Sequence, residues 1–119
     1  MEVTRVADIS ILHLFGEISF LEMNRIEKTL TSLRRANFNK VLLDMSSVDH
    51  VHYMIIKRIV ENALELRGRR GDIKITGLND DTRQIMRFTG ADQYLQDYAT
   101  ISEAILSFLK KSADTTLLQ

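Results

Sequence analysis

The stretch LLDMSSVDHVHYMIIKRI, residues 42–59, runs from an apolar strand into an amphipathic helix. The strand, Lys40–Met45, is apolar on both faces, as expected of a strand at the centre of a sheet. Further on, apolar side chains recur at three- and four-residue steps, the spacing of a helix with one buried face. A strand that passes directly into a helix is the building unit of an α/β sheet. The joint between them lies at His52, Tyr53 and Met54.

Two strands and a helix are predicted before this stretch. Residues 3–7 and 9–15 have the alternating pattern of strands, and Gly16 is expected to end the second one. Ser19 and Glu22 have capping-box spacing, which predicts that a helix begins there. The chain therefore reaches the central strand after a strand, a strand and a helix.

The segments after the joint alternate in the same way between helix and strand. In chain order they are a strand over residues 72–76, a short helix from residues 79–81 to Gly90, an edge strand over Tyr94–Asp97, and a last helix from the Thr100–Glu103 capping box. From Lys111 the helical pattern lapses, so residues 111–119 are predicted to form a flexible tail. The order predicts one α/β domain over residues 1–110, with a mixed, mostly parallel sheet of four to five strands and about four helices.

Composition narrows the class of function. The chain of 119 residues carries 16 basic and 16 acidic residues, a balance that argues against broad binding of nucleic acid or an anionic membrane. It has no cysteine, which excludes disulfides, thiolate catalysis and cysteine-bound zinc. No charged-then-apolar leader is present, and no apolar run approaches the roughly 20 residues needed to span a bilayer. We expect a cytoplasmic protein without direct membrane insertion.

Asp44 is the first candidate for chemistry, because it ends the central strand, where open α/β sheets gather their sites. A two-component receiver domain also has an aspartate there, but it needs further carboxylates after its first strand. Here that position holds Glu17 alone. The favoured interpretation is a structural aspartate that bonds the Ser46–Ser47 turn.

The pair His50 and His52 is the second candidate, with His13 elsewhere in the chain. A metal ion needs three or four ligands held by an outer shell, and no acid–histidine spacing supports this pair. The favoured interpretation is one surface imidazole and one at the helix start. A small enzyme or metal protein that uses His50, His52 and Asp44 is the disfavoured alternative, so no cofactor and no enzymatic activity are predicted.

The segment RGRRGD, residues 67–72, clusters three arginines at the carboxyl end of the predicted helix. Basic groups there complement the helix dipole, so capping is the favoured interpretation. Contact with a phosphate or an acidic partner is the alternative. The glycines do not fit a dinucleotide-binding fingerprint, which needs three of them at a helix start.

Residues 44–56 resemble the signature of STAS domains, the family of bacterial anti-sigma factor antagonists, which reads roughly D-L-S-x-V-x-F-I-D-S-S-G-L. Asp44, Ser46 and Val48 are identical to the signature, and Met45 is a conservative change. Three further segments resemble parts of the family in the same order: LFGEIS at residues 14–19, DIKITGLN at 72–79 and FTGADQYLQDYATISEAI at 88–105. The resemblance covers nearly the whole chain and implies a single-domain STAS-like fold.

The second half of the signature departs from the family. In phospho-regulated antagonists, the second serine of D-S-S-G-L accepts phosphate from a partner kinase that is also the anti-sigma factor. That position is Met54 here; Tyr53 replaces the preceding serine, His52 the aspartate and Ile55 the glycine. A thioether has no hydroxyl to phosphorylate, so the resemblance implies that the usual switch cannot operate at Met54.

By this resemblance the chain is a non-enzymatic module of transcription regulation that binds another protein. The partner would be a switch kinase or anti-sigma factor, or a larger regulatory assembly that contains related domains. The residues expected to form the contact are His52, Tyr53, Met54 and Ile55 at the helix entrance, with Gly16 and Glu17 as a second contact.

Three alternatives accompany this interpretation. The chain can instead be an accessory subunit of a membrane transport complex, a role that some STAS proteins fill. Phosphorylation can have moved to Tyr53, Ser46 or Ser47. The chain can also form a homodimer.

Overall fold

Five strands form one mixed sheet in the computed structural model, which describes the backbone of residues 1–117 and the side chains of residues 1–110. In sheet order they are β1 (Glu2–Val6), β2 (Ile9–Ile18), β3 (Lys40–Val51), β4 (Asp72–Thr76) and β5 (Asp97–Tyr98). β1 is antiparallel to β2, and every other neighbouring pair is parallel. The predicted mixed, mostly parallel sheet is confirmed.

Four α-helices accompany the sheet, as predicted. They are α1 (Phe20–Arg35), α2 (Tyr53–Arg67), α3 (Asp80–Thr89) and α4 (Ile101–Leu117), with a short 3₁₀ helix, η1 (Ala91–Gln93), after α3. Within residues 1–117, no helix combines the length and apolarity needed to cross a bilayer. The predicted tail over residues 111–119 falls outside the described side chains and stays a prediction.

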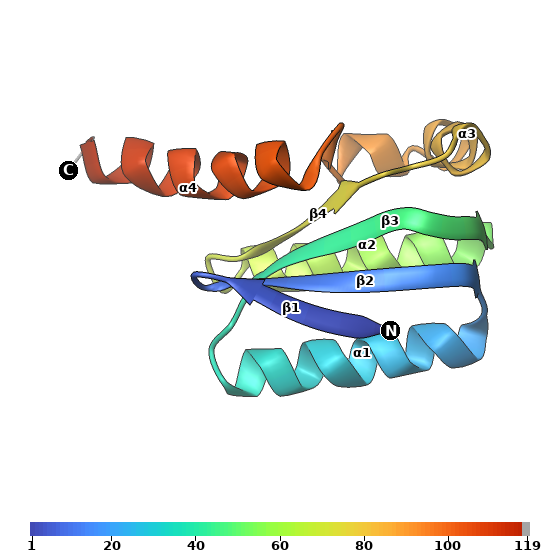
Figure 1. Ribbon diagram of the computed structural model, residues 1–119, viewed down its shortest axis with the longest axis horizontal. Helices are drawn as coiled ribbons and strands as arrows, with labels where there is room; N and C mark the ends of the chain where they lie inside the picture. The colour runs from blue at the N-terminus through green and yellow to red at the C-terminus, as the bar shows by residue number, and fades with distance from the viewer. Residues whose placement is uncertain (118–119) are drawn as a thin grey trace.

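Hydrophobic cores lie on both sides of the sheet, so the molecule has three layers. The larger core joins the sheet to α1, α2 and part of the α3–η1 segment. The smaller core joins the other face to α4, and its buried members are Ile9, Ile11, Leu42, Ala104 and Phe108. α1 and α4 accordingly lie on opposite sides of the sheet (Figure 1). The helices α1 and α2 therefore bury the apolar faces that their periodicity predicts.

The helix starts are set by side chains close in sequence. Ser19 Oγ accepts a hydrogen bond from the backbone N–H of Glu22 at 3.2 Å, and Thr100 Oγ1 accepts one from Glu103 at 3.1 Å. Both pairs were expected from their capping-box spacing. Gly90, with φ of +77°, ends α3 in the left-handed conformation that glycine adopts without strain.

β2 passes through Gly16 instead of ending there as predicted. Gly16 has a φ of +68°, and the pairing of β2 with β3 changes register between His13 and Phe15 and again between Gly16 and Glu17. Irregularities of this bulge type kink a strand locally without ending its pairing. β2 therefore continues to Ile18.

β3 is also longer than predicted, because it continues past Met45 to Val51. Only its first part, through Asp44, pairs with β4, whereas the rest pairs with β2 alone. In this second part Val48 and Val51 are buried while their polar neighbours face solvent. A half-exposed strand lacks the continuous apolar run by which a central strand is recognised, which explains the missed extension.

The edge strand was predicted at Tyr94–Asp97, but the structure places it at Asp97–Tyr98. Leu95 is buried in the larger core, and η1 shapes the chain just before it. Tyr98 packs against the smaller core beside α4. Leu95 is buried on one side of the sheet and Tyr98 packs on the other. These two contacts decide that the two-residue strand forms at Asp97–Tyr98.

Candidate functional site

The ends of β2 and β3 bring two helix starts together at one edge of the sheet. The strands are parallel, with Glu17 paired to His50 and Ile18 paired to Val51. α1 begins just after β2, and α2 begins just after β3 (Figure 1). The carboxyl ends of parallel strands are where α/β sheets place their sites. Gly16 and Glu17 therefore lie beside the entrance of α2, the arrangement expected for a two-part contact.

His52 caps α2. Its backbone is extended, and its Nδ1 accepts a hydrogen bond from the backbone N–H of Met54 at 3.2 Å. The role usually filled by a serine, threonine or aspartate oxygen thus belongs to a ring nitrogen. The His52 ring also stacks on Tyr53, with 4.5 Å between centroids, and contacts Phe20 of α1 at 5.6 Å. The predicted placement of His52 at the helix start is confirmed, and its capping bond fixes the ring.

Tyr53 and Met54 face solvent at the first turn of α2, with 56% and 45% of their surfaces exposed. Ile55, one residue further, is fully buried in the larger core with Ile59, four residues on. Ile55 was predicted as a contact residue, and the structure places its side chain inside the core. A side chain inside the core anchors the helix entrance but cannot touch a partner.

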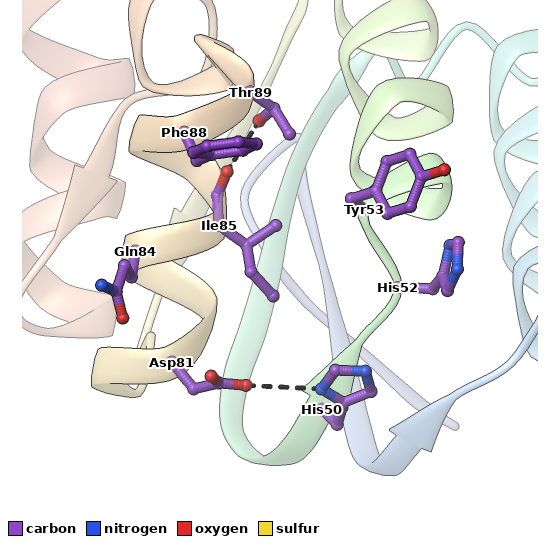
Figure 2. A pocket seen from close by; sticks show the side chains of 8 residues that line it. All are labelled: His50, His52, Tyr53, Asp81, Gln84, Ile85, Phe88 and Thr89. Carbon is purple, nitrogen blue, oxygen red and sulfur yellow. Dashed lines mark hydrogen bonds and ion pairs between the residues drawn. The ribbon is translucent and has the colours of Figure 1, made fainter.

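A groove of about 540 Å³ lies between the entrance of α2 and α3. Its lining residues are His50, His52, Tyr53, Asp81, Gln84, Ile85, Phe88 and Thr89. Figure 2 shows Tyr53 and Phe88 on facing walls, contributed by α2 and α3. Phe88 is 93% exposed, so a whole aromatic ring stands in solvent at the groove.

Sequence reasoning missed Phe88 and the groove. Phe88 lies two residues after Met86 in α3, with Arg87 between them, and only Met86 is buried. Period counting on a ten-residue helix does not tell the two apart, because the position of the sheet decides which face is covered. The available signal was that an aromatic lay two residues from the inner face of a short helix.

His50 lies at one end of the groove, where its Nδ1 is 3.4 Å from Asp81 Oδ2 (Figure 2). Both side chains are exposed, so this pair contributes little to stability. Within residues 1–110, no three histidine, cysteine, aspartate or glutamate side chains are placed to hold a metal ion. The two histidines of the H-x-H motif therefore have different roles: His50 pairs with Asp81 at the surface, and His52 caps α2.

We define the aromatic surface as five exposed side chains around the start of α2 and the adjoining groove: Phe20, His52, Tyr53, Met54 and Phe88. Ring contacts join Phe20, His52 and Tyr53, Met54 follows Tyr53, and Phe88 shares the groove with Tyr53. Contiguous exposed apolar side chains mark interaction sites on soluble proteins, and aromatic residues and methionine are enriched at such interfaces. The arrangement suits binding of another molecule and shows no nucleophile beside a base.

Asp44 is committed to the sheet. Its Oδ1 accepts hydrogen bonds from the Ser46 backbone N–H at 3.1 Å and the Ser46 hydroxyl at 2.7 Å, and its Oδ2 lies 2.8 Å from His13 Nδ1. His13 Nε2 in turn lies 2.8 Å from Thr4 Oγ1, so the network joins β3, β2 and β1. Burial alone would raise the pKa of Asp44, but the bonds from Ser46 and His13 outweigh it and lower that pKa. The predicted bond of Asp44 to Ser46 is present, but Ser46 and Ser47 belong to β3 and do not form the predicted turn.

The arginine cluster lies at the other end of α2. Arg67 is in the last turn of the helix, where its charge complements the dipole. Its Nε donates to Asp72 Oδ1 at 2.9 Å, and its guanidinium also donates to the carbonyl of Tyr94. Arg67 therefore ties α2 to β4 and to the segment after η1, away from the aromatic surface.

Comparison with known proteins places this fold. A family model described as "STAS domain" matches residues 1–104. A solved putative anti-sigma factor antagonist from Thermotoga maritima is similar with a TM-score of 0.82 and 21% identity, over 90% of this chain and 92% of that one. An anti-sigma factor antagonist from Mycobacterium paratuberculosis is similar with a TM-score of 0.78 and 19% identity, over 90% of this chain and 91% of that one. The antagonist SpoIIAA in its unphosphorylated form is similar with a TM-score of 0.76 and 17% identity, over 87% of this chain and 91% of that one. No curated protein matches the sequence.

Proposed function

This chain belongs to the STAS domain family, and on that premise we propose that it is a non-enzymatic module of bacterial signal transduction. It acts in the cytoplasm by binding a switch kinase that is also an anti-sigma factor, or a regulatory assembly that contains related domains. The fold it shares with several anti-sigma factor antagonists supports this class of partner.

The aromatic surface is the single observation that carries the proposal. Tyr53, Met54 and Phe88 each expose close to half or more of their surface at the entrance of α2 and the adjoining groove. Exposed tyrosine and phenylalanine side chains of this kind act as anchors that insert into pockets of a partner. Gly16 and Glu17 border the same entrance through the pairing of Glu17 with His50, so they form the second contact.

Phosphate has no acceptor at the position that corresponds to the family site. SpoIIAA, which shares the fold, is known in a phosphorylated and an unphosphorylated form. At Met54 this chain has a thioether, which cannot form a phosphate ester. The Ser46 hydroxyl, an alternative acceptor, already donates to the Asp44 carboxylate, whose negative charge opposes a phosphate nearby. Binding therefore proceeds without the usual phosphate switch.

Incubation with the switch kinase of the same genome and labelled ATP tests both parts of the proposal. We expect the natural protein to stay unlabelled and Met54→Ser, which restores a hydroxyl at the helix entrance, to be labelled if docking is intact. Tyr53→Ser combined with Met54→Ser is the matched variant that also restores the preceding serine. Stoichiometric labelling of the natural protein between Ser46 and Tyr53 would contradict the proposal.

Affinity purification under native conditions separates the proposal from its main rival. Recovery of a sigma-factor regulator supports it, whereas recovery of the ATPase of a membrane transport complex would assign the chain to that complex instead. Sedimentation of the purified protein measures the third alternative, the homodimer. A stable dimer that covers Tyr53 and Phe88 would show that the aromatic surface is not free for another partner.

A further inference from the structure

The five methionines of this chain divide sharply by exposure. Met23, Met45 and Met86 are buried in the larger core, whereas Met54 and the terminal Met1 are exposed. Because the chain has no cysteine, these thioethers are its most readily oxidised groups. An oxidant that reaches the folded protein therefore meets Met54 in the aromatic surface before it meets any buried methionine.

We propose that Met54 is a reversible oxidation site through which a peroxide weakens partner binding, an inference that rests on the proposed function. The sulfur lone pair forms an S–O bond while the O–O bond of hydrogen peroxide breaks. The released hydroxide takes the proton from the transferred oxygen and leaves as water. Sulfur is oxidised, the peroxide is reduced, and the product is methionine sulfoxide, which methionine sulfoxide reductases return to methionine.

The position of Met54 gives this change its effect. Met54 follows Tyr53 in the chain and exposes 45% of its surface at the first turn of α2. A sulfoxide places a strong hydrogen-bond acceptor there, and covering it with an apolar partner would leave that acceptor without a donor. The sulfoxide has no net charge, so the loss of affinity is smaller than a phosphate would cause. A bound partner shields the sulfur, so oxidation acts on the free protein.

Peptide mapping after brief treatment with dilute hydrogen peroxide tests the site without any partner. We expect Met54 to gain one oxygen atom about tenfold faster than Met23, Met45 and Met86, and at a rate close to that of Met1. Circular dichroism confirms that the protein stays folded during the treatment. Oxidation of Met54 as slow as that of the buried methionines would overturn the proposal.

Binding to the immobilised switch kinase tests the consequence. The treated natural protein is expected to bind about tenfold more weakly than its untreated sample, and incubation with methionine sulfoxide reductase should restore the affinity. Met54→Leu is the matched control, because it keeps an apolar side chain that peroxide does not oxidise. Each protein is compared with its own untreated sample, and Met54→Leu should show no change on treatment.

The two ideas fail in different ways. If the untreated protein binds the kinase and the oxidised protein binds equally well, the inference is overturned and the proposed function stands. If the untreated protein and untreated Met54→Leu both fail to bind, the proposed function is overturned, and the regulatory effect with it. An equal loss in peroxide-treated Met54→Leu would assign the effect to another residue and also overturn the inference.

Discussion

Asp44 and Met54 lie on one continuous strand-to-helix unit, and the fold uses them in opposite ways. The Asp44 carboxylate is enclosed by hydrogen bonds from Ser46 and His13, so it holds three strands together. The Met54 side chain stands in solvent beside Tyr53. The residue that looks most reactive in the sequence is bonded within the sheet, and the residue that looks inert is exposed at the start of α2.

The contrast teaches how a polar residue bonded within the fold differs from an exposed apolar one. A polar group whose bonds are all satisfied inside the fold has little left to offer a ligand. An exposed apolar group gains free energy only when something covers it. Four experiments separate these two roles, and they follow from the largest expected effect to the smallest.

The largest effect concerns the boundary between core and surface within α2. Ile55→Ala should lower the free energy of unfolding by about 2–5 kcal/mol, because it leaves a cavity in a closed core. Met54→Ala, its neighbour and control, should change that free energy by less than about 0.5 kcal/mol, because the side chain is exposed. Urea denaturation measures both. A similar loss from the two substitutions would mean that Met54 belongs to the core.

Asp44→Ala tests the enclosed end of the comparison. Removing the carboxylate leaves the Ser46 N–H and His13 Nδ1 without their partner, and we expect a loss of about 1–3 kcal/mol in unfolding free energy. Ser46→Ala removes a single side-chain bond to Asp44 and should cost less, about 1 kcal/mol. Neither substitution should change kinase binding in a pull-down at a temperature where both variants are folded. Lost binding in folded Asp44→Ala would give this residue a direct role in recognition.

Met54→Asp tests the open end and should separate affinity from stability. A carboxylate in the first turn of α2 interacts favourably with the helix dipole, so unfolding free energy should stay constant or rise by about 0.3–1 kcal/mol. Partner binding should weaken by about 2 kcal/mol, because a charge would be buried in the interface. Thermal melting and titration calorimetry give the two values, with Met54→Leu as the control. Unchanged affinity would place the contact surface elsewhere.

The smallest effect is the dependence of stability on pH through Asp44. Hydrogen bonds hold the pKa of Asp44 below its ordinary value in the folded protein. A lowered folded-state pKa contributes stability that is fully present above the unfolded value of about 3.9 and is lost as the pH falls through the folded value. Urea denaturation between neutral pH and pH of about 2 should show the difference between the natural protein and Asp44→Asn shrinking with acid. A constant difference across this range would contradict the lowered pKa.

The family was predicted from the sequence, because the first half of the STAS signature is intact in this chain. The same comparison identified Met54 as the changed position, because residue identity can be read without a structure. The helical periodicity placed Ile55 on the inner face of α2, but it did not say how far Met54 is exposed. The exposure of Met54 is decided by how α2 packs against the sheet.

The sequence by itself determined the order of the elements, the caps at Ser19 and Thr100, and the apolar faces of α1, α2 and α4. These features depend on residues a few positions apart, whose interactions form within one turn or one strand. Only the tertiary structure decided how far β2 and β3 extend, that Phe88 stands opposite Tyr53, and that Asp44 is bonded to His13. These contacts join residues about thirty positions apart, and local periodicity contains no information on which distant surfaces meet.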